Sequence, residues 1–134
     1  MNDSIKVTVS NSKSDLQAHI LVNGHQLLSD EPVELGGKNE GPTAEELLAS
    51  SLATCTTITL RMYMNYKKIT TVEDIQVEVV MEKDKENGKT TFKRTVKVDG
   101  DYGEELAKKF LHIANVCPVH KILSGQINIE TEII

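Results

Sequence analysis

One stretch decides how this chain is interpreted: residues 41–55, which read GPTAEELLASSLATC. Thr43 is a favourable helix N-cap, and Glu46, three positions later, completes a capping box. Neither glycine nor proline occurs from Ala44 to Lys67, so we expect one long helix there, or two joined by a kink. Cys55 then lies inside this helical segment, after a run of small residues.

Alternation of apolar and polar residues predicts strands on both sides of this helix, with a tight hairpin turn at Asn23-Gly24. The other expected elements are strands over 5–10, 16–22, 25–28, 74–83 and 90–98, a helix over 101–114, a short turn or helix over 116–123 interrupted by Pro118, and a last strand over 126–133. The order βββ-α-ββ-α-β predicts a single α+β domain over residues 1–134 with mostly antiparallel pairing.

Composition narrows the class of protein. With 134 residues, 39% hydrophobic and 26% charged, the chain has the make-up of a globular domain. A formal charge of -5 argues against a nucleic-acid partner, and the densest basic run, residues 83–94, is interpreted as the solvated face of a hairpin. A polar start and the lack of any apolar run of ~18–20 residues predict a cytoplasmic protein without a membrane partner. Nothing in the sequence predicts a cofactor.

The two cysteines, Cys55 and Cys117, are the candidates for chemistry. Static disulfides are rare in the cytoplasm, so each cysteine is either a small buried apolar residue or a redox group. Their positions alone leave both interpretations open.

Two segments together resemble the osmotically inducible protein C (OsmC) and organic hydroperoxide resistance family. In residues 41–55 a Pro-x-x-Glu start opens a helix, and Cys55 follows Glu45 by ten places. Residues 116–125, VCPVHKILSG, are similar to the family's Cys-Pro segment. The order of expected elements also matches from about residue 5 to residue 133. The chain looks closest to the less characterised OsmC-like branch, which keeps both cysteines.

The resemblance implies a thiol-dependent peroxidase that reduces organic hydroperoxides in an oxidative or osmotic stress response. Cys55 aligns with the peroxidatic cysteine, Cys117 with the resolving cysteine, and Glu45 with an acidic residue that acts through a guanidinium. Cys55 would become a sulfenic acid, Cys117 would condense with it to a disulfide, and an external dithiol would reduce that disulfide.

Active family members carry an arginine near the N-terminus, whereas this chain has none before Arg61. A thiolate needs a positive neighbour, and the sequence offers Arg61, six residues after Cys55, or Arg94 in the hairpin. We take Arg61 as the fourth site residue. The alternative for both arginines is an ordinary residue facing water.

Helix geometry predicts an intertwined homodimer. Ten residues separate Glu45 from Cys55 by ~15 Å along a straight helix and by about 80° around it, so they cannot share a site within one helix. If two copies cross near Ser50, where small residues allow close approach, Glu45 of one subunit comes near Cys55 of the other. Each of the two sites would then draw on both subunits.

Two alternatives stay open beside the enzyme. The first is a non-catalytic redox sensor or small-molecule-binding dimer whose cysteines form a slow disulfide. The second is a purely structural domain with inert, buried cysteines, whose thiols would resist alkylation until the chain unfolds. His120 forms a Cys-x-x-His pair with Cys117, but one pair supplies only two ligands, so we predict no metal site. We expect His120 to be exposed or to be a polar neighbour of Cys117.

Overall fold

A computed structural model describes residues 4–134. The chain forms two compact units, one ending at Leu48 and the other running from Ala49 to Ile134. Both units have the α+β character and the antiparallel pairing that the sequence predicts. No helix in the described part of the chain is long and apolar enough to cross a membrane.

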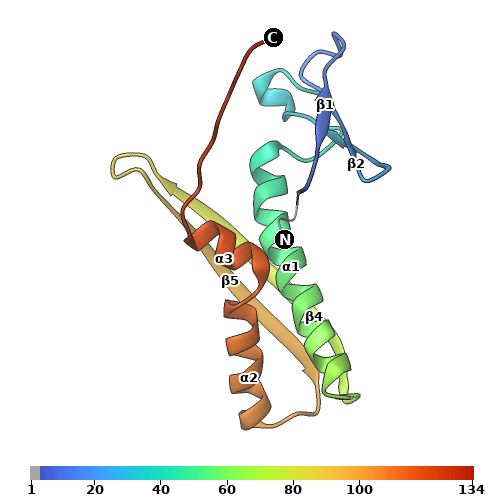
Figure 1. Ribbon diagram of the computed structural model, residues 1–134, viewed down its shortest axis with the longest axis vertical. Coiled ribbons are helices and arrows are strands. Elements are labelled where there is room, and N and C mark those ends of the chain that lie inside the picture. The colour runs from blue at the N-terminus through green and yellow to red at the C-terminus, as the bar shows by residue number, and fades with distance from the viewer. Residues whose placement is uncertain (1–3) are drawn as a thin grey trace. The chain divides into compact units, whose positions relative to one another are not determined.

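The first unit contains a three-stranded antiparallel sheet in the order β1-β2-β3, shown in blue in Figure 1. Its strands are β1 (Thr8–Ser10), β2 (Ala18–Val22) and β3 (His25–Ser29). Asn23 and Gly24 both have positive φ, 50° and 78°, as a two-residue hairpin turn requires. Strand β1 begins at Thr8, three residues later than expected, and Thr8 pairs with Leu21 near the end of β2.

After β3 a short 3-10 helix, η1 (Val33–Leu35), precedes α1 (Ala44–Tyr66), one uninterrupted helix of 23 residues. The predicted capping box is confirmed. The backbone N–H of Glu46 donates to Thr43 Oγ1 at 3.1 Å, and the backbone N–H of Thr43 donates to Glu46 Oε1 at 2.8 Å.

The second unit is built on a long antiparallel hairpin, β4 (Val72–Asp84) and β5 (Lys89–Gly100). Its core joins the buried face of α1 to the hairpin and to α2 (Glu104–Asn115). The fully packed members of this core are Leu60, Met64, Val72, Ile75 and Phe110. Helix α2 begins three residues later than expected, because Gly103, with φ 79°, is its N-cap.

Two expectations near the C-terminus are wrong. Pro118 does not interrupt a helix but opens one, α3 (Pro118–Ser124), where its missing N–H would have had no helical partner. Residues 126–133 form no strand, and the chain beyond α3 runs as an extended trace (Figure 1). A strand needs a neighbour for its backbone hydrogen bonds, and no sheet edge in residues 4–134 pairs with this segment.

Candidate active site

Cys117 lies between two helices, immediately after α2 and at the N-cap of α3. Its side chain is completely buried, with 0% exposure. Its surroundings are polar, however, since a threonine hydroxyl, a guanidinium and a second thiol all lie within reach of its sulfur. Cys117 is therefore more than an apolar filler of the core.

Cys55 supplies the second thiol from the middle of α1 and is half-buried. Its side chain lies close enough to Cys117 to affect the ionisation of that thiol, and its Sγ lies 3.8 Å from Thr59 Oγ1. The fold thus brings together two cysteines that are 62 positions apart in the sequence. The more exposed member of the pair is Cys55.

Thr56, the residue after Cys55, connects α1 to the buried thiol. Its hydroxyl has no exposure, donates to the carbonyl of Leu52 at 2.7 Å, and lies 3.6 Å from Cys117 Sγ. The same oxygen accepts a hydrogen bond of 3.1 Å from Nη1 of Arg94. Thr56 therefore lies at the meeting point of helix, thiol and cation.

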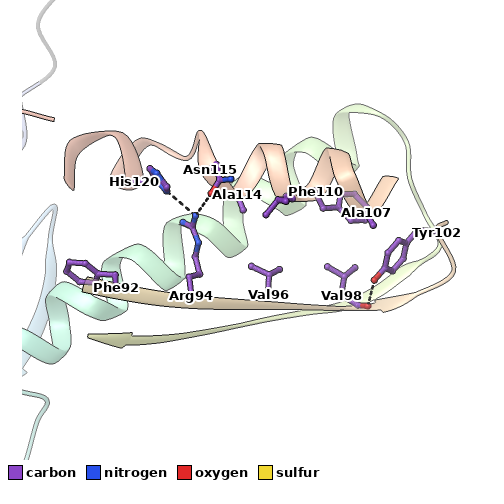
Figure 2. Close-up of a pocket in the computed structure, with 11 residues that line it drawn as sticks. Phe92, Arg94, Val96, Val98, Tyr102, Ala107, Phe110, Ala114, Asn115 and His120 are labelled. Carbon is purple, nitrogen blue, oxygen red and sulfur yellow. Dashed lines mark hydrogen bonds between the residues drawn. The ribbon is translucent and has the colours of Figure 1, made fainter. Parts of the chain in front are cut away.

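Arg94 is the cation of this site, and its placement corrects the expectation that residues 83–94 all face water. In Figure 2 its side chain rises from β5 toward α2 and α3. Nη1 lies 3.9 Å from Cys117 Sγ, and Nη2 donates to Oδ1 of Asn115 at 3.0 Å. Nη2 also lies 3.0 Å from Nδ1 of His120, which must accept because a guanidinium carries only donors. Arg94 is thus held in place from three sides.

The thiol of Cys117 responds to this environment. Burial by itself raises the pKa of Cys117, but the other contributions outweigh it and leave that pKa below the usual value for cysteine. These contributions are, in decreasing order, hydrogen bonding with the backbone N–H of His120, with the side chain of Thr56 and with the side chain of Cys55, and the charge of Arg94. His120 is therefore a polar neighbour of Cys117, one of the two roles expected for it.

A groove of about 470 Å³ runs between β5 and α2, and its lining includes Arg94, Asn115 and His120 but neither cysteine. Figure 2 shows Arg94 and His120 at one end and Tyr102 at the other. Its remaining walls are mostly apolar: Phe92, Val96, Val98, Ala107, Phe110, Leu111 and Ala114, with Asn115 beside Arg94. The groove could take an apolar molecule that carries one polar or anionic end.

Comparison with known proteins now identifies the family. Residues 37–132 match the family of OsmC-like proteins. This chain belongs to the OsmC-like protein family. No curated protein matches it.

Solved structures share the fold of this OsmC-like chain. The OsmC-like protein from Mycoplasma pneumoniae superposes with a TM-score of 0.75 at 20% identity, covering 93% of this chain and 90% of that one. The organic hydroperoxide resistance protein OsmC from Legionella pneumophila gives 0.67 at 23% identity, with 93% and 92% covered. The organic hydroperoxide resistance protein OhrB of Bacillus subtilis gives 0.61 at 23% identity, with 92% of each chain covered. At these identities the likeness shows the fold.

The other two residues that the family resemblance or the sequence suggested lie on α1. Glu45 is in its first turn, ten positions before Cys55. Arg61 follows Cys55 by six positions, which places it about 120° around the helix from Cys55. Within residues 4–134 the guanidinium that reaches a cysteine is that of Arg94, and Arg61 contacts neither sulfur.

Arg94 carried a signal in the sequence. Along β5 the residues at even positions, Phe92, Arg94, Val96 and Val98, share one face, and three of these four are apolar. An arginine in such a row points toward the core.

Three or more His, Cys, Asp or Glu side chains placed to hold a metal ion do not occur together in the described part of the chain.

Proposed function

We propose that this OsmC-like protein is a two-cysteine peroxidase that reduces organic hydroperoxides, with Cys55 as the attacking thiol and Cys117 as the resolving thiol. The observation that carries the proposal is the proximity of the two thiols to each other and to a partly buried cation, Arg94. Its family context agrees, since related folds include organic hydroperoxide resistance proteins from Legionella pneumophila and Bacillus subtilis.

The reaction would run in three balanced steps. Cys55, once it has lost its proton, attacks one oxygen of the hydroperoxide, the O–O bond breaks, and the alcohol leaves after its alkoxide takes up a proton. Cys117 then attacks the Cys55 sulfenic acid, an S–S bond forms, and hydroxide leaves as water. An external dithiol supplies two electrons and two protons by exchange and restores both thiols.

Two features favour an organic substrate and this assignment of the thiols. The groove beside Arg94 offers an apolar wall that an alkyl or aryl hydroperoxide can contact and hydrogen peroxide cannot use. Cys55 is half-buried whereas Cys117 has no exposure, so the peroxide reaches Cys55 first.

We further propose that the working molecule is a homodimer. Helix α1 exposes an apolar stripe at intervals of four residues, made of Ile58, Met62 and Tyr66. Residues 126–134 alternate in polarity and expose Ile127, Ile129 and Ile133. A second copy of the chain would cover the stripe and supply a partner for that segment.

The experiment counts free thiols in the reduced protein within seconds of adding excess cumene hydroperoxide or hydrogen peroxide. We expect rapid loss of both thiols with the organic peroxide, slower loss with hydrogen peroxide, and no rapid loss in Cys55→Ser. Arg61→Gln is the matched control, because Arg61 contacts neither sulfur within the described residues. Thiols that survive excess of both oxidants would eliminate the enzyme, and a slow loss without turnover by a dithiol would indicate a redox sensor.

A further inference from the structure

The cation of this site lies beside the wrong thiol for a simple two-cysteine scheme. A peroxidatic cysteine attacks as a thiolate and needs a positive neighbour. Arg94, however, lies 3.9 Å from the sulfur of Cys117, and the hydrogen-bonding partners that the structure gives to Cys55 are Thr59 and Cys117. Cys55, the half-buried and more exposed of the two thiols, is therefore the one to which residues 4–134 give no charged hydrogen-bonding partner.

Hydrogen bonds to three helices hold the guanidinium of Arg94 beside Cys117. Three hydrogen bonds of 3.0–3.1 Å, to Thr56 on α1, Asn115 on α2 and His120 on α3, fix its guanidinium from three different helices. Each bond ends on a neutral acceptor, so none of these three cancels the positive charge. The strand that carries Arg94 contributes Phe92 and Val96 on either side of it, and these apolar neighbours strengthen its electrostatic effect.

From this geometry we infer that the negative charge of the reduced pair resides on Cys117, held by Arg94, and that Cys117 is the base that activates Cys55. In this scheme Cys117 is a thiolate in the resting protein and accepts a hydrogen bond from the Cys55 thiol, while the guanidinium of Arg94 lies 3.9 Å from its sulfur. The groups that face Cys117 are then Arg94 from β5, Cys55 and Thr56 from α1, and His120 from α3. Arg94 is a positioning residue in this scheme, because it acts through Cys117.

With Cys117 as the base, every proton transfer in the reaction has a donor and an acceptor. This catalytic role of Cys117 rests on the proposed function. Cys117 takes the proton of Cys55 as Cys55 attacks the hydroperoxide, and the O–O bond breaks. The departing alkoxide takes that proton back from Cys117, so the alcohol leaves and the Cys117 thiolate forms again. The regenerated thiolate then attacks the Cys55 sulfenic acid, and hydroxide leaves with a proton from solvent as water. A single thiolate thus serves both steps.

The test is a titration of the thiolate by its ultraviolet absorbance, with no peroxide present. The two single-cysteine variants, Cys55→Ser and Cys117→Ser, are titrated with and without Arg94→Gln. We expect the thiol that remains in Cys55→Ser to ionise at lower pH than the one in Cys117→Ser. Arg94→Gln should shift the midpoint of Cys55→Ser upward, whereas Arg94→Lys and the control Arg61→Gln should leave it low.

A lower midpoint in Cys117→Ser than in Cys55→Ser would overturn the inference, and so would equal shifts from Arg94→Gln and Arg61→Gln. The comparison of the two single-cysteine variants needs no change at Arg94, so it decides the question even if Arg94→Gln does not fold. Because the titration contains no oxidant, its result is independent of the peroxidase assay. A confirmed midpoint order with inert thiols would reject the peroxidase alone.

Discussion

Thr56 is the single residue on which the packing of the thiol site depends most directly. Its buried hydroxyl donates to the carbonyl of Leu52 and accepts from Arg94, and it lies 3.6 Å from Cys117 Sγ. Valine has almost the same shape but no polar atom, so in Thr56→Val the guanidinium keeps its charge and loses a buried acceptor. The rest of the site would remain in place.

We predict that Thr56→Val lowers the free energy of unfolding by about 1–3 kcal/mol, because the partly buried guanidinium of Arg94 loses its hydrogen bond to a buried acceptor. Urea denaturation of the reduced protein measures this change. Thr57→Val is the matched control, because Thr57 makes the same kind of bond, to the carbonyl of Ala53 at 2.8 Å, without touching the site. Equal losses in the two variants would show that Thr56 has no special role.

The pairing of the two cysteines and the inward orientation of Arg94 are the features of the site that the residues alone do not predict. Cys55 and Cys117 could be paired from the sequence only through a family resemblance, since 62 residues separate them. The basic run that contains Arg94 predicts a solvated face, because a run of basic residues in a charged hairpin usually faces water. The alternation of β5 holds the opposite information, and the structure follows the alternation: Lys93 pairs with Glu82 on the exposed side at 3.0 Å, and Arg94 points inward.

At the scale of elements, the loop between β3 and α1 is organised around one buried carboxylate, Asp30. Burial raises the pKa of Asp30, but hydrogen bonds outweigh it and hold that pKa below its usual range. The donors are the backbone N–H groups of Glu31, Glu40 and Lys38 and the side-chain amide of Gln17. Asp30 therefore fixes the path of the chain that leads into the capping box of α1.

We predict that Asp30→Asn lowers the melting temperature near neutral pH, because an amide N–H₂ would face backbone N–H donors. The folded-state pKa lies below the unfolded value of about 3.9, so Asp30 stabilises the fold above that pH, and its contribution disappears as pH falls through the folded pKa. The difference between wild type and Asp30→Asn should then shrink in acid. Asp15→Asn is the control, since the carboxylate of Asp15 forms an exposed ion pair of 3.7 Å with Lys38. A difference that grows in acid would contradict this role.

Elements whose signals are local were predicted well. The capping box at Thr43 and the turn at Asn23-Gly24 each depend on residues within a few positions, and both are present. The strand expected over residues 126–133 is missing, although its apolar alternation is clear in the sequence. Alternation predicts which residues could share a face, but a strand also needs a neighbouring sheet edge, and that neighbour is not encoded in the segment itself.

At the scale of the whole molecule, the proposed homodimer follows from surfaces that a single chain leaves uncovered. Met62 is 64% exposed, at the centre of the apolar stripe on α1. We predict that Met62→Asp converts the dimer to monomers, because a carboxylate buried at an interface without a partner strongly opposes association. Sedimentation at micromolar concentration measures the state. Val33→Asp, at a residue of similar exposure in η1, should remain dimeric, and a wild-type protein that sediments as a monomer would contradict the proposal.

If Cys55 and Cys117 of one chain form a redox pair, peroxide should link them to each other by a disulfide. Reduced protein is treated with one equivalent of cumene hydroperoxide, and its mass and peptide map are recorded without reducing agent. We expect each chain to lose the mass of two hydrogen atoms and the Cys55 and Cys117 peptides to be linked to each other. Cys55 carrying added oxygen while Cys117 stays a free thiol, or a disulfide that joins two chains, would contradict this expectation.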